Sequence, residues 1–331
     1  MRRSLVARRS LVAGVGGYLP LRSLTNDQLA AELALDTSDD WIRERTGIAR
    51  RHFASADETA CFMGAEAARR ALAMAGIDAS SIDCIIVATA TPDQAFPATA
   101  VTIQAALGVT QGFAFDLSAA CSGFVYALSV ADAMIRTGQV TTALVIGTEV
   151  YSRILNWQDR GTCVLFGDGA GALLLRADEP TDDAEAKGVL STHLHADGRL
   201  ADILYIDGAT GQTDKPQHLV MNGREVFRHA VSKLAGAVEE ALQANDLTTA
   251  DIDWLVPHQA NRRIIDAMGK RLNLNENQVV ITVDRHANTS AASIPLALAE
   301  AVNDGRIKPG HLVLIEALGG GLTWGSALIR L

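Results

Sequence analysis

The segment Ser81-Ile-Asp-Cys-Ile-Ile-Val87 has a counterpart in Asp251-Ile-Asp-Trp-Leu-Val256. Each segment follows a stretch with the apolar spacing of a helix, at residues 58–75 in the first case and 225–244 in the second. Short apolar runs that alternate with helices are typical of parallel strands covered on both faces. The sequence therefore predicts a buried α/β unit that occurs twice in the chain.

The order of elements downstream is the same in both halves. A predicted strand at 113–117 leads into a helix that begins near Cys121, and a strand at 279–283 leads through 286–290 into a helix that ends near Asn303. Further strands follow at 143–147 and 311–316, and each half closes with a predicted Gly-rich hairpin, at 167–176 and 319–330. We therefore predict two halves, residues 10–180 and 181–331, stacked as helix, sheet, helix, sheet and helix layers. Chance similarity of short apolar strings is the alternative, and the matching order argues against it.

The overall composition is that of a folded α/β protein, and its charge argues against nucleic acid as the main partner. The chain has 331 residues, 48% of them hydrophobic, and 29 basic against 38 acidic residues give a net charge of −9. This balance opposes nucleic acid as the main partner, and an acidic partner would need a local basic patch. No apolar run approaches the roughly 18 residues of a membrane-spanning helix, so no membrane association is predicted.

The four cysteines show neither a CxxC pair nor a metal-binding spacing, so no metal site is predicted. Cys84 and Cys163 open apolar runs and are expected to be buried thiols. This usage fits a reducing, cytoplasmic protein.

The N-terminus repeats a hexapeptide, RRSLVA, at residues 2–7 and 8–13. Arg8 and Arg9 interrupt the apolar stretch that a signal peptide would need. We expect the second copy to lead into the first core strand and the first copy to be an extension, and a basic targeting arm is the alternative.

Cys121 is the cysteine best placed for chemistry. It lies in Asp116-Leu-Ser-Ala-Ala-Cys-Ser-Gly-Phe124, where a predicted strand ends and a helix begins. Unpaired amides at a helix N-terminus favour a thiolate, and the small neighbouring residues leave room for a substrate.

His258 and Asn288 follow apolar segments of the second half. His258 stands at the end of the strand in Trp254-Leu-Val-Pro-His-Gln-Ala-Asn261, where ligands gather in open α/β sheets. Asn288 by itself would be a turn or N-cap residue. If a pseudo-twofold axis relates the halves, however, the junctions that carry Cys121 and Asn288 face each other, with His258 beside them.

Six strings together resemble the β-ketoacyl-acyl carrier protein synthase III family of thiolase-like condensing enzymes. They are DLSAACSGF at 116–124, GTCVLFGDGAGA at 161–172, STHLHADG at 191–198, WLVPHQAN at 254–261, DRHANTSAAS at 284–293 and GGGLTWGSALIR at 319–330. The resemblance runs from about Gly14 to Leu331 and implies a five-layer thiolase-like αβαβα fold and a homodimer. It also implies condensation of acetyl-CoA, or another short acyl-CoA, with malonyl-acyl carrier protein, as the initiating step of type II fatty-acid synthesis.

The resemblance assigns Cys121 as the acyl-carrying nucleophile, with His258 and Asn288 completing the triad. The amides of Cys121 and of Gly320 would form the oxyanion hole. His258 and Asn288 would hydrogen-bond the thioester oxygen while malonyl thioester loses CO2. This chemistry uses a CoA thioester as substrate and needs no metal or redox cofactor.

The resemblance also implies residues that handle the substrates. Trp41 and Arg160 match residues that enclose the adenine of CoA, and Arg45 and Asn261 match further CoA or pantetheine contacts. Phe96 resembles a residue that closes the acyl pocket from the partner subunit. Met221 and Gly223 are further substrate-binding candidates, and Arg262, Arg263, Arg228 and Lys233 are candidates for docking the acidic carrier protein. A solvated helix face is the alternative for these last four residues.

Two positions depart from the common family pattern. Ser122 follows the nucleophile where Ala is usual, and Ala287 precedes the triad asparagine where Gly is usual. We expect Ser122 to alter the polarity of the pocket and Ala287 to alter the backbone of its loop.

Other functions fit the sequence less well. A secondary-metabolite ketosynthase with another primer is the nearest alternative, whereas a thiolase needs a second catalytic cysteine and none occurs after Cys163. A dinucleotide-binding oxidoreductase is disfavoured because Leu19 replaces the third glycine after Gly14, and because the apolar run 173–175 follows the second Gly-rich string where a helix is required. The intact Cys, His and Asn set argues against a non-catalytic scaffold.

Overall fold

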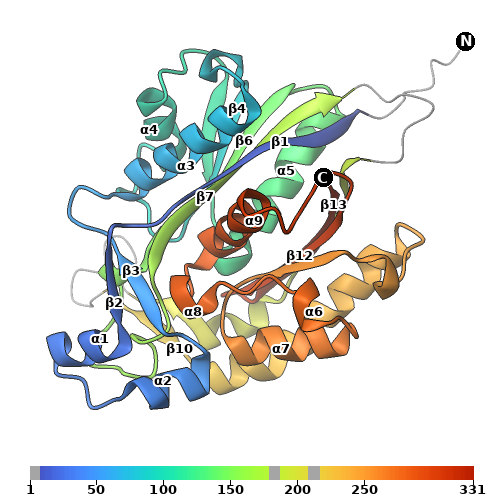
Figure 1. Ribbon diagram of the computed structural model, residues 1–331. Helices are drawn as coiled ribbons and strands as arrows, with labels where there is room; N and C mark the ends of the chain where they lie inside the picture. The colour runs from blue at the N-terminus through green and yellow to red at the C-terminus, as the bar shows by residue number, and fades with distance from the viewer. Residues whose placement is uncertain (1–7, 179–186, 208–216) are drawn as a thin grey trace, which may run out of the picture.

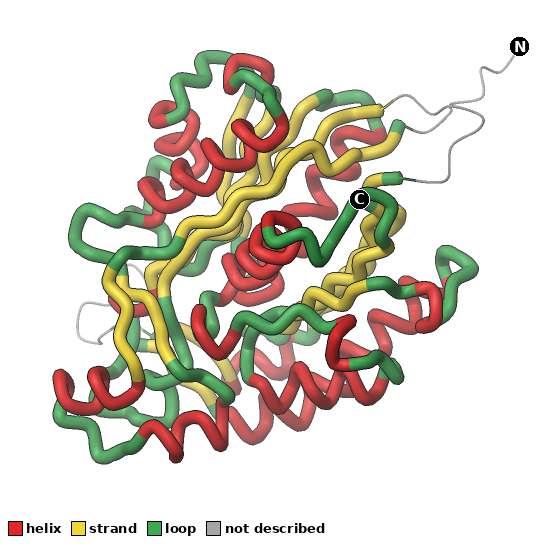
Figure 2. Tube along the Cα trace, in the orientation of Figure 1, coloured by secondary structure: helices red, strands yellow, loops and turns green. Residues whose placement is uncertain are grey.

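Two β-sheets enclose a central layer of helices in the computed structural model, which describes residues 8–178, 187–207 and 217–331 (Figures 1 and 2). The first sheet has the order β1-β7-β6-β4-β5 and the second the order β11-β12-β13-β8. Their strands are β1 (Arg9–Tyr18), β4 (Cys84–Ala88), β5 (Phe113–Leu117), β6 (Thr142–Val150), β7 (Asp168–Asp178), β8 (Gly188–Ala196), β11 (Trp254–Pro257), β12 (Leu312–Gly319) and β13 (Thr323–Arg330). Two short ribbons pair β2 (Arg22–Thr25) with β3 (Arg50–Phe53) and β9 (Leu204–Ile206) with β10 (Leu219–Met221).

The helices form three layers around the two sheets. In the middle layer, α5 (Gly123–Arg136) and α9 (Ser293–Asn303) pack against strands of both sheets. One outer layer holds α3 (Ala60–Ala75) and α4 (Thr99–Ala106), and the other holds α6 (Gly223–Gln243) and α7 (Arg262–Arg271) (Figure 1). The remaining helices are α1 (Asn26–Leu33), α2 (Asp39–Thr46), α8 (Val283–His286) and the 3₁₀ turns η1 (Ala79–Ser81), η2 (Ala120–Ser122), η3 (Tyr151–Arg153), η4 (Gly198–Ile203), η5 (Thr249–Asp251), η6 (Glu276–Gln278) and η7 (Ser290–Ala292). The predicted five-layer α/β fold is confirmed.

The two sheets share one plan, which confirms the predicted duplication. In each sheet a parallel pair, β4 with β6 or β11 with β12, continues into two antiparallel strands. An aspartate precedes the first strand of each pair and anchors its neighbour in the same way. Asp83 Oδ2 accepts the amide of Thr142 at 3.0 Å, and Asp253 Oδ2 accepts the amide of Leu312 at 2.7 Å.

Two local predictions are wrong. The segment 279–283 is not a strand, since only an isolated bridge joins Val279 to Leu255 before α8 begins. The amides of Thr282 and Val283 instead bond the buried Oε1 of Gln259, at 2.8 and 3.0 Å, which draws this segment away from the sheet. The segment 167–176 is not a hairpin but lies in the single strand β7, which pairs with β1 on one side and β6 on the other.

The N-terminal repeat and the predicted boundary between the two halves lie only partly within the described residues. The second hexapeptide copy enters β1 at Arg9 as expected, whereas the first copy, residues 2–7, lies outside the described residues. The predicted boundary between residues 180 and 181 also lies outside them; strands of the first sheet come from 9–178 and those of the second from 188–330. No helix in the described ranges is long and apolar enough to cross a membrane.

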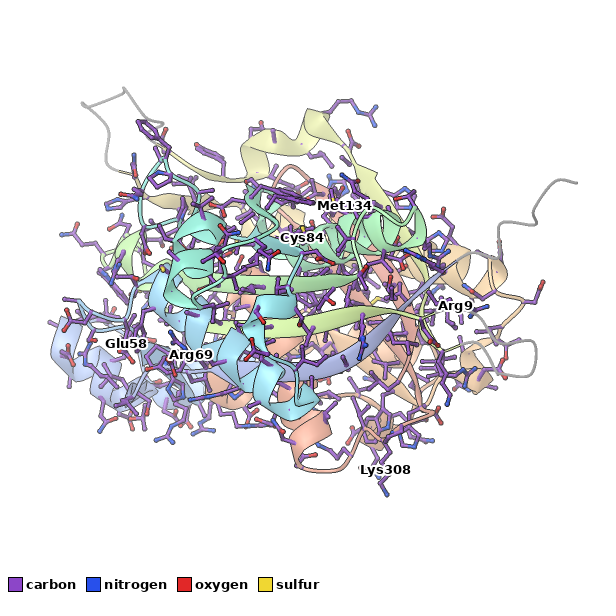
Figure 3. All side chains as sticks on the ribbon, turned by 90° about the horizontal axis from the view of Figure 1, so that it is seen from above. Arg9, Glu58, Arg69, Cys84, Met134 and Lys308 are labelled. Carbon is purple, nitrogen blue, oxygen red and sulfur yellow. The ribbon has the colours of Figure 1, made fainter. Side chains whose placement is uncertain are left out.

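The expected burial of two thiols is confirmed. Cys84 and Cys163 are 0% exposed, and Cys84 lies inside the molecule in Figure 3, where the exposed Lys308 projects from its periphery. Burial raises the pKa of the Cys84 thiol to about 12 and that of Cys163 to about 11, so both are unreactive thiols at neutral pH.

Candidate active site

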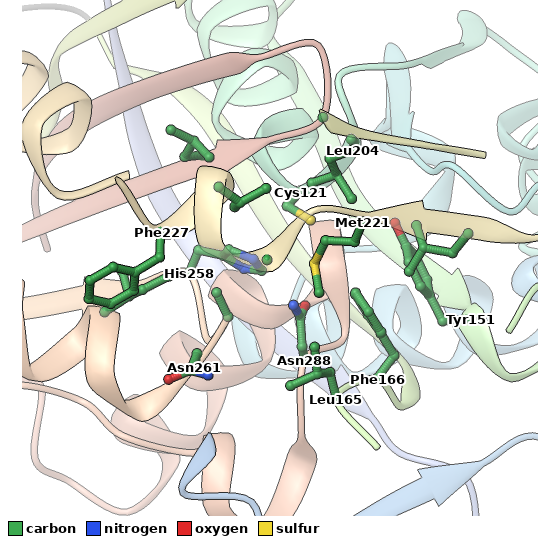
Figure 4. Close-up of a pocket in the computed structure, with 18 of the residues that line it drawn as sticks. Cys121, Tyr151, Leu165, Phe166, Leu204, Met221, Phe227, His258, Asn261 and Asn288 are labelled. Atoms are coloured by element: carbon green, nitrogen blue, oxygen red, sulfur yellow. The ribbon is translucent and has the colours of Figure 1, made fainter. Parts of the chain in front are cut away.

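A cavity of about 1030 Å³ holds the three residues that the sequence singled out (Figure 4). Cys121, His258 and Asn288 all line it, although they follow β5, β11 and α8, which lie far apart in the sequence. Apolar side chains form much of the wall, among them Phe166 and Leu318. A mostly apolar cavity with a few convergent polar groups is the usual form of a small-molecule site.

Cys121 is held at a tight strand-to-helix turn. Ala120 has a φ of +46°, and the chain then passes through η2 into α5. The turn at 319–321 approaches the nucleophile closely, because a β-carbon at Gly319 would lie 2.6 Å from the Cys121 amide nitrogen. The cavity reaches the next residue, Gly320. The structure therefore brings together the two segments predicted to form the oxyanion hole.

The protonation state of Cys121 differs from the prediction. The side chain is 7% exposed, and burial raises the pKa of the thiol to about 12, while a hydrogen bond with Ser290 lowers it in part. Loss of hydration penalises the charged sulfur more than its polar neighbours compensate. The free protein therefore holds a thiol at neutral pH, and acyl transfer requires a proton acceptor.

His258 is a neutral hydrogen-bonding group. Burial lowers the pKa of its imidazole to about 3, and its Nδ1 lies 2.6 Å from Ser293 Oγ. Ser293 Oγ accepts the amide of Gln259 at 3.3 Å, which leaves its hydroxyl hydrogen for Nδ1. An imidazole that accepts at Nδ1 carries its proton on Nε2. His258 is thereby prepared to donate a hydrogen bond into the cavity.

Asn288 is oriented by its own loop. Its Oδ1 accepts the amide of Ser290 at 2.9 Å, so its amide nitrogen is left as the donor (Figure 4). Its backbone bonds the carbonyl of Leu165 and the amide of Gly167, each at 3.0 Å, which fixes the loop against the first half. Asn288 and His258 thus present two N–H donors beside one sulfur.

Comparisons with known proteins agree with this geometry. Residues 115–198 match the model of 3-oxoacyl-[acyl-carrier-protein] synthase III, and residues 242–331 match the model of its C-terminal part. The β-ketoacyl-[acyl-carrier-protein] synthase III of Acidiphilium cryptum is 78% identical over 98% of this chain and 99% of its own length. The chain belongs to the β-ketoacyl-[acyl-carrier-protein] synthase III family. It is therefore a condensing acyltransferase.

Solved structures place the fold in the same family. The synthase III of Aquifex aeolicus has a TM-score of 0.90 and 42% identity, covering 97% of this chain and 100% of its own. The priming β-ketosynthase of the R1128 polyketide pathway has a TM-score of 0.92 but 37% identity, covering 98% of this chain and 97% of its own. Since identity to the curated synthase III of Acidiphilium cryptum is far higher, the secondary-metabolism alternative is not favoured.

Most of the predicted CoA-binding residues line the cavity. The guanidinium carbons of Arg45 and Arg160 lie 4.5 and 5.2 Å from the Trp41 ring centroid, so cation–π contacts hold all three together. Arg160 also donates to the carbonyl of Asp36 and does not itself line the cavity. Asn261 caps α7, its Nδ2 donating to the Arg45 carbonyl at 3.1 Å. Trp41, Arg45, Asn261, Met221 and Gly223 all line the cavity.

Phe96 and the docking candidates other than Arg263 are not part of the cavity lining. Phe96 is 84% exposed. Of the docking candidates, Arg263 lines the cavity, Arg262 pairs with Asp266 at 2.7 Å, and Arg228 pairs with Glu225 at 2.6 Å.

Lys233 is the docking candidate that the structure does not support. Its side chain is 19% exposed, its Nζ lies 3.9 Å from the Trp324 ring centroid, and it pairs with Asp197 at 3.8 Å. These contacts hold the ammonium group against β13 and away from a docking partner.

The departures from the family pattern have different consequences. Ser122 is 0% exposed and does not line the cavity; its hydroxyl bonds the Ala119 carbonyl and Thr323 Oγ1, both at 2.8 Å. The expected change in pocket polarity is therefore wrong. Ala287 has φ +58° and ψ −164°, a conformation that favours glycine, so the expected effect on its backbone is present.

Sequence reasoning missed three polar residues beside the triad: Tyr151, Ser290 and Ser293. Ser293 orients His258, while Tyr151 and Ser290 act directly on the Cys121 thiol. Both serines lie in the string DRHANTSAAS. When the two halves are aligned by their repeated elements, Ser290 corresponds to Ala120 in the turn that carries the nucleophile. Tyr151 carried no such signal, because the sequence around it is an irregular connection.

Proposed function

We propose that this synthase III transfers an acyl group from acetyl-CoA, or another short acyl-CoA, to Cys121 and condenses it with malonyl-acyl carrier protein. The observation that carries this proposal is the convergence of Cys121, His258 and Asn288 in one largely apolar cavity. The printed names of the relatives support the carrier protein as the second substrate.

In the first step the Cys121 sulfur attacks the thioester carbon of acyl-CoA. The developing oxyanion lies between the amides of Cys121 and Gly320, and each such donor typically contributes about 3 kcal/mol to the transition state. The close approach of Gly319 to the Cys121 amide supports this pairing. CoA leaves, and the acyl group remains on sulfur.

In the second step malonyl thioester loses CO2 and forms an enolate. His258 Nε2 and the Asn288 amide nitrogen donate hydrogen bonds to the thioester oxygen, which stabilises the enolate charge. Burial keeps the imidazole neutral, which suits this role because the electrons come from decarboxylation and no proton is removed from carbon. The enolate carbon then attacks the acyl group and expels the Cys121 sulfur.

The entrance of the cavity suits a CoA or pantetheine chain. Trp41, with Arg45 and Arg160 over its ring, offers an aromatic and cationic surface for an adenine nucleotide. Arg263 lines the same cavity and Arg262 lies next to it on α7, where they would attract an acidic carrier protein despite the net charge of −9.

We further propose a cytoplasmic homodimer. The strand β5 ends the first sheet among the described residues, and Phe113 on it and Val101 on α4 are exposed large hydrophobic side chains, as is Phe96 nearby in sequence. Such a surface favours burial against a second copy, in which Phe96 would close the partner's acyl pocket.

A primer panel tests the proposed reaction. The protein is incubated with malonyl-acyl carrier protein and a series of acyl-CoAs, and the products are identified by mass. We expect acetoacetyl-acyl carrier protein, or its analogue from a short branched primer. Hydrolysis of acyl-CoA without a condensed product from any primer would overturn the proposal.

A further inference from the structure

Glu149 is a fully buried carboxyl for which the two-step reaction gives no role. It lies near the end of β6 and is 0% exposed. Its Oε2 accepts Thr91 Oγ1 at 2.7 Å and the Ala90 amide at 3.1 Å, whereas its Oε1 has no hydrogen-bond partner among the described residues. Buried carboxylates are normally paired on both oxygens, so the unpartnered oxygen marks a place where a proton can bind.

A hydroxyl connects this carboxyl with the nucleophile. Tyr151 donates its hydroxyl to Ser290 Oγ at 3.0 Å, so the hydroxyl hydrogen of Ser290 is free for another acceptor. Ser290 lowers the pKa of both Cys121 and Glu149 and so lies close to each, although no hydrogen bond of standard geometry reaches Glu149 Oε1. Thiol, hydroxyl and carboxyl therefore form one buried cluster on the side of the sulfur where Tyr151 lies.

Acyl transfer needs a proton acceptor, and the nearby imidazole does not provide one. The pKa of His258 is lowered to about 3, so its basicity is weak. Burial raises the pKa of Glu149 to about 7, close to the value that a general base needs at neutral pH. The carboxyl thus has both the contact and the basicity.

We propose that Glu149 accepts the Cys121 proton through Ser290 during acyl transfer and returns it when the thiol is regenerated. Ser290 is the catalytic residue in this step, because it contacts the reacting sulfur, and Glu149 acts through it. This inference rests on the proposed role of Cys121 as the acyl carrier.

The proton and electron balance closes over the two steps. In acyl transfer the Cys121 S–H bond breaks, its proton moves to Ser290 Oγ while the Ser290 proton moves to Glu149, and the sulfur forms its bond to the acyl carbon. CoA leaves as a thiolate and takes one proton from solvent. In condensation the Cys121 sulfur is expelled with its electron pair and recovers the proton from Glu149 along the same path. The net reaction consumes one proton, the one taken by CoA.

The test measures acyl transfer alone, with acetyl-CoA and no malonyl-acyl carrier protein, followed by intact-protein mass at times between about pH 5.5 and 9. We expect the rate to rise with pH through about 7, as Glu149 ionises. Glu149→Gln should lose this rise and react about 100-fold more slowly at pH 8. A Glu149→Gln variant that keeps the rise would overturn the inference.

The rise of the acylation rate near pH 7 can be assigned to Glu149 by comparison with the other buried titratable groups. Burial raises the pKa of Cys121 to about 12 and that of Tyr151 well above its usual value, so neither titrates near pH 7. Glu316 on β12 has a pKa raised to about 8 and is likewise fully buried with one unpartnered oxygen. Glu316→Gln is therefore the matched control, and we expect it to keep the rise through pH 7; loss of the rise in this variant instead would overturn the assignment.

Stability separates a proton-transfer role from a structural one. The pKa of Glu149 is raised from 4.5 to about 7 on folding, so its ionisation opposes folding, and stability falls as the pH rises through this window. Glu149→Gln should therefore unfold at an equal or higher temperature at pH 8. A lower unfolding temperature, with equal losses of acyl transfer and condensation, would make Glu149 a structural anchor of residues 89–91. If the unaltered protein forms no acyl adduct on Cys121, the proposed function itself fails.

Discussion

The junctions at residues 118–123 and 288–293 have the same backbone but different chemistry. In both, a residue with positive φ, Ala120 at +46° and Ser290 at +50°, begins a 3₁₀ turn that enters a helix of the central layer. The next residue is Cys121 in the first half and Ala291 in the second. One junction holds a nucleophile, and its structural equivalent holds a methyl group.

The difference shows how a duplicated fold builds an asymmetric site. A β-carbon at Gly147 would lie 2.3 Å from the Ala291 carbonyl oxygen, so this junction is packed tightly against β6, and Ala291 does not line the cavity. The second half instead contributes Asn288 and Ser290 from the same loop and His258 from the end of β11. Thus the first half supplies the sulfur together with Tyr151, and the second half supplies His258, Asn288 and Ser290.

The largest expected effect comes from removing the nucleophile. Cys121→Ser should lower acyl transfer from acetyl-CoA by at least about 1000-fold while the circular dichroism and the unfolding temperature stay close to those of the unaltered protein. The double variant Cys121→Ala/Ala291→Cys should also fail, because its thiol does not face the cavity. Acylation of that relocated thiol would break the comparison between the junctions.

Removing the donors of the second half should separate the two steps. We expect His258→Ala and Asn288→Ala to form the acyl-enzyme at close to the normal rate but to lose about 100-fold or more in decarboxylation of malonyl-acyl carrier protein, since each loses one enolate donor. Acyl adduct by mass and CO2 release from labelled malonyl substrate report the two steps. Equal loss of both would contradict the division of roles between the halves.

Ser293 tests whether the tautomer of His258 matters. Ser293→Ala removes the hydrogen bond to Nδ1, so Nε2 is no longer held as the donor, and we expect decarboxylation to fall about tenfold. Ser293→Thr keeps a hydroxyl and should restore part of the rate. A Ser293→Ala variant with unchanged decarboxylation would show that the imidazole is oriented by its packing alone.

A smaller effect is expected from the basic residue Arg263, which lines the cavity near the proposed docking surface. Arg263→Glu should raise the KM for malonyl-acyl carrier protein about five- to tenfold, because it places a negative charge where an acidic partner docks. The KM for acyl-CoA should change less. Lys270→Glu, an equal charge change at the other end of α7, is the control and should leave both values almost unchanged. Equal effects of Arg263→Glu on both substrates would remove the docking surface.

The smallest effect concerns the backbone of the second junction. Ala287 has a φ of +58°, whereas the first junction has positive φ only at Ala120. Ala287→Gly should relieve about 1–3 kcal/mol of strain against about 1 kcal/mol of added chain entropy in the unfolded state. We therefore expect the free energy of unfolding, measured by urea denaturation, to rise by about 1 kcal/mol. A lower free energy of unfolding would show that the alanine methyl packs favourably.

The sequence predicted the fold well because both halves repeat the same apolar strands and helices. It also singled out Cys121, His258 and Asn288, since each stands in a specific string ahead of a helix. The predicted strand at 279–283 is wrong. The apolar run resembles a strand, but the side chain of Gln259 accepts the Thr282 amide instead.

Other features depend on tertiary contacts that no local pattern encodes. The Cys121 thiol was expected to ionise at the helix N-terminus, yet burial raises its pKa to about 12. Lys233 was assigned to a basic surface by its place on α6, but Trp324 from a strand far away in sequence covers it. Glu149 and Tyr151 enter the site only because β6 and η7 meet there.

The most direct measurement is the position of the acyl group after brief exposure of the unaltered protein to labelled acetyl-CoA. Peptide mapping by mass should find a single acetyl group on the peptide that contains Cys121, and addition of malonyl-acyl carrier protein should discharge it as acetoacetyl product. Label on Cys61, Cys84 or Cys163, or an adduct on Cys121 that malonyl-acyl carrier protein cannot discharge, would contradict the account.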